Sequence, residues 1–140
     1  MVDISKLKTV EDFIDYDFER TDVPDKYLGD YTHANFFKKY FIPIARRRMR
    51  KIAEKIGAKL TFSGGYFYFS GFLERNGACV YFYVGDVRYN LRWYDSVLYR
   101  DAKDTSDYHG GVNRYCSFDD LEENADWLLE SLVLAVKAEN

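Results

Sequence analysis

The sequence predicts a single α+β domain, with helices before and after a four-stranded antiparallel meander. Two observations predict this fold. A central stretch, residues 61–85, alternates aromatic and aliphatic side chains around an Asn-Gly pair, whereas the stretches on either side carry apolar residues at helical spacing. The chain has 140 residues, of which 47% are hydrophobic and 31% charged, so its size and composition are those of one globular domain.

The Asn76-Gly77 pair predicts a two-residue turn at the tip of a β-hairpin. Both turn positions require positive φ, which Asn tolerates and Gly adopts freely. Counting outward from the turn gives the register of the two strands, because each residue then has one partner across the hairpin. The expected pairs are Arg75 with Ala78, Leu73 with Val80, Gly71 with Phe82, and Phe69 with Val84.

The two faces of this hairpin differ in chemistry, because successive side chains point to opposite sides of a sheet. One face is ordinary core, and the other is an aromatic face tipped with hydroxyl groups, of a kind that can stack unpaired nucleic-acid bases. So large an exposed aromatic patch is unusual on a monomer, which favours coverage by an N-terminal helix or by a protein partner. The binding candidates on this face are Tyr68, Tyr81 and Tyr83.

The meander is expected to contain strands at residues 58–63, 66–75, 78–85 and 96–100. The first three are hairpin neighbours, which makes the sheet antiparallel. Gly71, inside the second strand, indicates a bulge or a closely packed neighbouring backbone. Residues 86–95 remain unassigned.

Two helical stretches precede the sheet. The first begins at Thr9, a suitable N-cap, and stops before Pro24. The second runs from Thr32 to Gly57, a residue type that commonly ends a helix. Pro43 interrupts this second stretch, and the apolar residues before and after it point in different directions. Because proline removes a helical hydrogen bond, we expect a kink or a break into two helical pieces at Pro43.

The C-terminal part of the chain predicts a loop followed by a helix. Residues 101–116 are rich in Asp, Gly and Asn, which form turns. Ser117 then caps the helix, with Asp120 three residues on as in a capping box. The apolar residues of this helix recur at helical spacing, so it should pack on the aliphatic face of the sheet. They are Leu121, Ala125, Leu128, Leu129, Leu132 and Val136.

Charge is strongly segregated along the chain, although the net charge is only −3. Residues 32–60 contain nine basic and one acidic residue, whereas residues 101–140 contain three basic and ten acidic ones. Three interpretations of the basic helix remain open: a solvated face, a surface for phosphates or an acidic partner, and docking onto the acidic C-terminal helix. The binding candidates on it are Arg46, Arg47, Arg48, Arg50 and Lys51.

Few side chains could carry catalysis. His109 lies among Asp and Gly in the 101–116 loop, where a metal or phosphate site can be drawn, but the chain contains no metal-binding or nucleotide-binding motif. An ordinary mobile loop is favoured, and His109 is kept as a binding candidate. Cys116 precedes a helix N-terminus, yet it fits a buried packing role better than that of a nucleophile. We therefore expect no enzyme activity, no cofactor and no metal.

Cysteine use and hydropathy indicate where the protein resides. Cys79 and Cys116 are the only cysteines, and a domain of this size needs no disulfide, so both are expected to be reduced. The N-terminal residues lack the apolar stretch of a signal peptide, and no run of 18 apolar residues occurs. The sequence therefore predicts a cytoplasmic protein that does not enter membranes.

Residues 97–124, VLYRDAKDTSDYHGGVNRYCSFDDLEEN, resemble small accessory proteins encoded by bacterial phages and integrative elements. In those proteins a strand ending LYR-x-A-K is followed by an acidic DY-x-GG loop and a capped helix. The resemblance covers about a fifth of the chain, contains no catalytic signature and therefore implies a context more than an activity. Mobile-element proteins often bind and inhibit host machinery such as restriction or CRISPR nucleases.

Together, these features predict a non-enzymatic protein-binding module whose partner is a host or element-encoded protein. Segregated charge, an aromatic face and the lack of a catalytic set all favour it. The alternative is a nucleic-acid-binding protein that uses the basic helix together with the aromatic sheet face.

Overall fold

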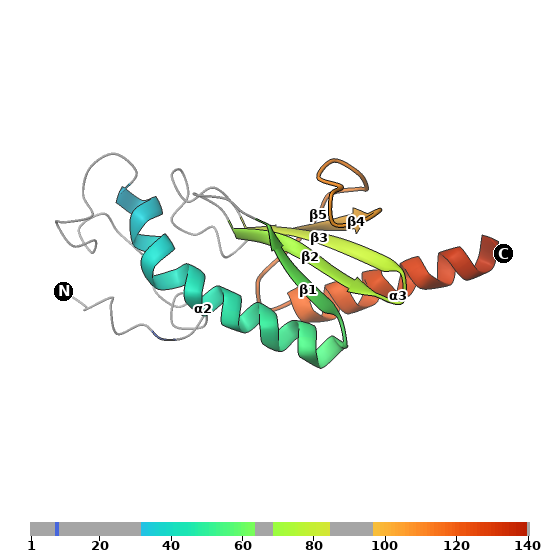
Figure 1. Cartoon of the computed structure of the whole chain (residues 1–140), viewed down its shortest axis with the longest axis horizontal. Coiled ribbons are helices and arrows are strands. Elements are labelled where there is room, and N and C mark those ends of the chain that lie inside the picture. The colour runs from blue at the N-terminus through green and yellow to red at the C-terminus, as the bar shows by residue number, and fades with distance from the viewer. Residues whose placement is uncertain (1–7, 9–31, 64–68, 85–96, 140) are drawn as a thin grey trace.

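The computed structural model describes residue 8 and residues 32–63, 69–84 and 97–139 (Figure 1). The helix expected from Thr9 and the unassigned segment 86–95 lie outside these residues. The described elements are α2 (Thr32–Ile56), β1 (Lys59–Ser63), β2 (Phe69–Arg75), β3 (Ala78–Val84), β4 (Val97–Ala102), β5 (Arg114–Cys116) and α3 (Leu121–Glu139). The predicted α+β class, with helices before and after an antiparallel sheet, is confirmed.

The sheet has five strands in the described part of the chain, so the expected number of four was wrong. Its strands lie in the order β1-β2-β3-β4-β5, and every neighbouring pair is antiparallel. The additional strand, β5, falls inside the segment 101–116 that the sequence predicts as a loop. It pairs Leu98 with Tyr115 and Val97 with Cys116, which gives backbone partners to β4. A strand of three residues is too short to reveal itself by alternation.

The predicted β2–β3 hairpin is confirmed in turn and register. Asn76 and Gly77 both have positive φ, at 52° and 83°. All four expected pairs are present, from Arg75 with Ala78 at the turn to Phe69 with Val84. Local turn chemistry alone was sufficient here, because a two-residue turn leaves only one register.

Gly71 marks a close backbone approach and not a bulge. It pairs with Phe62 on one side and Phe82 on the other, with no break in either register. A Cβ atom at this position would lie 2.4 Å from the carbonyl oxygen of Thr61 and 2.8 Å from the ring of Phe82. Only glycine fits this space without displacing the neighbouring strand.

The expected break at Pro43 is absent, since α2 is a single helix that continues through this residue. Figure 1 shows its axis bending in the N-terminal part. Pro43 is exposed. A proline on the solvent side lets water satisfy the carbonyl that has lost its partner, so the helix can continue through this residue.

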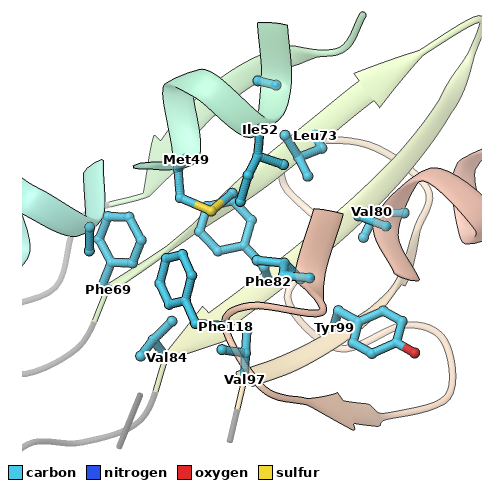
Figure 2. Close-up of a cluster of buried hydrophobic side chains, with 14 of the residues drawn as sticks. Met49, Ile52, Phe69, Leu73, Val80, Phe82, Val84, Val97, Tyr99 and Phe118 are labelled. Atoms are coloured by element: carbon cyan, nitrogen blue, oxygen red, sulfur yellow. The ribbon is translucent and has the colours of Figure 1, made fainter. Parts of the chain in front are cut away.

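Helices α2 and α3 pack on the same face of the sheet, which we call the inner face (Figure 1). Figure 2 shows how Met49 and Ile52 of α2 lie over Leu73 and Phe82 of the sheet, with Phe118 beside them. All five side chains are at most 1% exposed. The predicted packing of the C-terminal helix on the aliphatic face is thereby confirmed.

The last turns of α3 extend past the β2–β3 turn (Figure 1). Val136, expected in the packed stripe, is 59% exposed for this reason, because the sheet ends before the helix does. In the ranges that the structure describes, no helix is both long enough and apolar enough to cross a membrane.

Candidate binding surface

The face of the sheet opposite the helices, here called the outer face, carries rows of side chains that cross from strand to strand. The register defines each row, because directly paired residues point to the same side. One row consists of Thr61, Phe72, Tyr81 and Arg100, and the next of Ser63, Ser70, Tyr83, Leu98 and Tyr115.

The first of these rows lies beneath the loop that joins β4 to β5, residues 103–113. Phe72 and Tyr81 are only 1% and 8% exposed. The ring of Tyr108, from the loop, packs edge-on against both, with centroid distances of 5.4 and 5.9 Å. Part of the aromatic face is therefore covered, as the sequence favours, and a loop supplies the cover where a helix was expected.

This β4–β5 loop is ordered by one carboxylate. Asp107 accepts hydrogen bonds from the backbone N–H groups of Lys103 at 2.9 Å, His109 at 3.2 Å and Gly110 at 2.7 Å. These bonds, and to a smaller extent the charge of Arg100, hold the pKa of Asp107 below its usual value. The predicted loop therefore contains a hydrogen-bond network of its own, centred on the Asp107 carboxylate.

The end of the loop depends on Gly111. Its φ is +79°, and a Cβ atom there would lie 2.3 Å from the carbonyl oxygen of Asp101. The Asp101 carboxylate accepts from the backbone N–H of Val112 at 3.4 Å and pairs with Arg114 at 3.5 Å. Glycine therefore lets the loop return closely onto β4 before β5 begins.

Arg100 joins the loop to the sheet. The residue is 5% exposed, and its guanidinium carbon lies 4.6 Å from the centroid of the Tyr81 ring. One Nη atom donates to the carbonyl oxygen of Gly110 at 2.5 Å, and the other donates to the carbonyl oxygen of Tyr108. Arg100 thus binds the carbonyl groups of the two residues that flank His109, while its guanidinium group lies over the Tyr81 ring.

A hollow of about 330 Å³ opens between the loop and the second row. It brings together three residues predicted from the sequence, namely Tyr81, Tyr83 and His109. Tyr68 lies outside the described residues. The remaining lining residues, which sequence reasoning missed, are Leu98, Arg100, Tyr108 and Asn113.

Around the hollow, aromatic side chains remain accessible. Tyr108 is 46% exposed and Tyr115 63%, while Tyr83 is half-buried. We call Tyr83, Tyr108 and Tyr115 the outer-face rings. Tyr115 was missed because its strand was missed, and its pairing with Leu98, next to Tyr83, is what extends the aromatic surface across the sheet.

The basic residues of α2 divide into groups with different neighbours. Arg48 pairs with Asp119 at 3.7 Å, and Lys55 pairs with Glu122 at 3.1 Å. Docking onto the acidic C-terminal helix, one of the three open interpretations, therefore applies to these two cations. Both pairs are partly exposed, so each contributes at most about 1 kcal/mol.

The other basic candidates remain accessible. Arg46 and Arg50 lie over the ring of Phe62, with guanidinium carbons 5.2 and 5.5 Å from its centroid. Arg47 and Lys51 are exposed, and neither forms an ion pair within the described part of the chain. Four cations thus form an accessible basic surface along α2, which we call the basic surface.

The structure does not bring the basic surface and the outer-face rings together. The buried side chains of α2 pack on the inner face, whereas the rings lie on the outer face. Figure 1 shows α2 and the β4–β5 loop on opposite sides of the sheet. A single ligand that contacts both would have to pass around the edge of the sheet.

Cys79 and Cys116 are free, and both are unsuited to nucleophilic chemistry. Burial, with smaller contributions from nearby carboxylates, raises the pKa of each thiol to about 11. Cys116 thus behaves as the packing residue that the sequence favours. Among the residues that the structure describes, no three His, Cys, Asp or Glu side chains gather as a metal site requires.

Comparison of the chain with protein-family models, with curated proteins and with solved structures found no match.

Proposed function

We propose that this protein is a non-enzymatic protein-binding module and that its partner binds the outer-face rings and the hollow between them. Tyrosine is enriched at protein interfaces, because its ring offers a large contact area and its hydroxyl a hydrogen bond. The partner class that we propose is a host or element-encoded protein, in line with the resemblance to mobile-element accessory proteins. Inhibition of host machinery such as a restriction or CRISPR nuclease would follow from such binding.

The observation that carries this proposal is that one accessible ring, that of Tyr108, is held in place. Tyr108 is 46% exposed, yet it packs on Phe72 and Tyr81, and the backbone beside it is bound by Arg100 and Asp107. A ring fixed before binding loses little conformational entropy when a partner covers it. Held aromatic side chains of this kind are typical of residues that dominate binding energy.

Partner capture with matched variants tests the proposal. Tyr83→Ala and Tyr115→Ala remove accessible rings from the outer face, and Trp127→Ala removes a ring that is 54% exposed on α3. We expect a stoichiometric partner whose affinity falls about 30-fold or more in the outer-face double variant, as for central interface residues. Trp127→Ala should bind normally. Loss of binding in Trp127→Ala alone, or no partner at all, would contradict the proposal.

Nucleic-acid binding through the basic surface is the second candidate function. It is favoured by one observation, the accessibility of Arg46, Arg47, Arg50 and Lys51 along one helix. If each of these cations contacts a phosphate, each substitution by Gln should weaken binding equally for all base sequences and reduce the salt slope by about one. Tyr83→Ala should leave that slope unchanged, because the outer face lies on the other side of the sheet.

Affinity for single-stranded and duplex oligonucleotides at two salt concentrations provides the measurement. Binding weaker than roughly 10⁻⁴ M at physiological salt, which is below ordinary non-specific affinity, would exclude this candidate.

A further inference from the structure

Arg100 is a buried cation without an ion pair in the part of the chain that the structure describes. Its residue is 5% exposed, and its hydrogen bonds go to two backbone carbonyl oxygens. A guanidinium group has five N–H donors, so three of them remain after these bonds. The charge of Arg100 acts on the nearby Asp107 carboxylate, but the two form no ion pair, so the remaining donors of this buried cation lack a charged acceptor among the described residues.

The hollow that Arg100 lines is rich in donors and contains no acidic residue. Its other lining residues with a polar side chain are Tyr81, Tyr83, Tyr108, His109 and Asn113. Each of these can donate a hydrogen bond.

This lining is unexpected in an acidic segment. The loop and the strand before it contain three aspartates, none of which lines the hollow, and each of them has other partners. Asp101 binds Val112 and Arg114, Asp104 binds Ser106, and Asp107 binds the backbone of Lys103, His109 and Gly110. The hollow therefore presents positive charge and donors in a chain whose net charge is −3.

We infer that this hollow binds a carboxylate, supplied by an Asp or Glu side chain of the partner protein. Arginine recognises carboxylates through paired hydrogen bonds, and hydrogen bonds between two charged groups are about twice as strong as neutral ones. The volume of about 330 Å³ lies near the lower end of small-ligand pockets, which suits one acidic side chain. The inference rests on the proposed function, since the acid arrives as part of a protein that covers the outer-face rings.

A titration of the isolated protein tests the inference without the partner. The probe is N-acetyl-glutamate methylamide, whose single carboxylate is that of the side chain, and the neutral control is N-acetyl-glutamine methylamide. At constant ionic strength, the NMR signals of the Arg100 Nε–H and the Asn113 side-chain amide should shift saturably with the glutamate probe. A Kd of about 1 to 10 mM is expected for so small a ligand. The glutamine control should produce no saturable shift.

Two mild variants connect that shift to the hollow. Tyr83→Phe removes only a hydroxyl group, and Asn113→Ala removes only an amide group. The contact between the rings of Tyr108 and Phe72 should therefore persist in both variants, which a nuclear Overhauser effect between the two rings would verify. Each variant should weaken binding of the probe by about threefold to tenfold, which corresponds to one lost hydrogen bond.

Several results would overturn the inference. They are the absence of saturable shifts, equal shifts with the glutamine control, unchanged affinity in both variants, or saturable binding of inorganic phosphate without binding of the glutamate probe. A negative titration together with loss of the partner in the Tyr83→Ala, Tyr115→Ala variant would refute the acid-binding hollow and leave the proposed function standing. Retention of the partner by that variant would refute the proposed function itself.

Discussion

Arg75 connects three elements through one guanidinium group. Its Nη1 atom donates to the carbonyl oxygen of Ile56 at the end of α2 at 2.8 Å and to the carboxylate of Asp126 in α3 at 2.5 Å. Its Nη2 atom donates to the Asp126 carbonyl oxygen at 3.2 Å and lies 3.6 Å from the Glu130 carboxylate. The Arg75 side chain is 15% exposed, so these bonds are partly shielded from water. One residue beside the hairpin turn therefore ties both helices to the sheet.

Replacing Arg75 should destabilise the fold more than a surface ion pair would. Arg75→Ala leaves the carbonyl oxygen of Ile56 without its side-chain donor and removes charge-assisted bonds to Asp126, so a loss of about 2–3 kcal/mol is expected. Arg75→Lys should lose less stability than Arg75→Ala, because lysine keeps the positive charge. It should still be less stable than the wild type, because lysine lacks the planar set of donors that arginine has. Chemical denaturation measures both variants. A loss in Arg75→Ala no larger than about 0.5 kcal/mol, the range of an isolated surface pair, would show that the network is not structural.

Gly71 provides a second test at the level of single residues. An alanine there would place Cβ 2.4 Å from the backbone oxygen of Thr61, which cannot rotate away, so Gly71→Ala should cost about 1–3 kcal/mol through strand displacement. Glu74→Ala, on the same strand but with a half-buried side chain, serves as the control and should cost less than about 1 kcal/mol. Thermal unfolding followed by circular dichroism compares them. If Gly71→Ala and Glu74→Ala were equally stable, the close approach of the Thr61 backbone to Gly71 would be refuted.

Sequence reasoning succeeded where the cause is local and failed where partners are distant. The turn at Asn76-Gly77 and its register were predicted because two adjacent residues determine them. The position of Tyr108 was not, because its ring meets Phe72 and Tyr81, which lie 36 and 27 residues earlier in the chain. The burial of Arg100 is likewise not predictable from the sequence, since no neighbouring residue in the chain indicates it.

At the scale of elements, the β4–β5 loop links the fold to the candidate surface. It joins two neighbouring strands, crosses over Phe72 and Tyr81, and presents Tyr108 and His109 to the hollow. The glycines and aspartates that predict a loop from sequence are also those that order it, since Asp107 binds its backbone. Composition thus indicated a loop correctly but gave no sign of its order or of β5.

Acid should weaken the hydrogen bonds that the Asp107 carboxylate makes within this loop. Backbone N–H groups bind the ionised form of Asp107 and hold its pKa below the ordinary value of 3.8. A carboxyl group whose pKa is lower in the folded than in the unfolded state stabilises the folded state when the pH is above the pKa of the unfolded state. For Asp107 this stabilisation is present above pH 3.8 and is lost as the pH falls through the lowered pKa of the folded state.

Amide NMR signals measured from neutral pH into acid provide the test. The amide signal of Lys103, which donates to the Asp107 carboxylate, should change with a midpoint below pH 3.8. In Asp107→Asn this transition should be absent. A transition in the wild type with a midpoint at or above pH 3.8, the ordinary pKa of an Asp side chain, would contradict the hydrogen-bond network around Asp107.

At the scale of the whole molecule, charge segregation has two consequences. Part of it is internal, because acidic residues of α3 and of the turn before it pair with Arg48, Lys55 and Arg75. The basic residues without such pairs form the basic surface on the helix side of the sheet. The outer-face rings lie on the opposite side. The sequence predicted both the basic helix and the aromatic strand face, but their separation depends on which face the helices cover, which no local pattern specifies.

The most direct test of the account is hydrogen–deuterium exchange of the protein alone and in complex with its captured partner. Binding at the outer face should slow exchange in the β4–β5 loop, residues 103–113, and in β5, because a partner there removes water from these amides. The exposed segment of α2 at residues 46–51 should exchange at the same rate in both samples. Slower exchange confined to α2, with the loop and β5 unchanged, would contradict the account and place the partner on the basic surface.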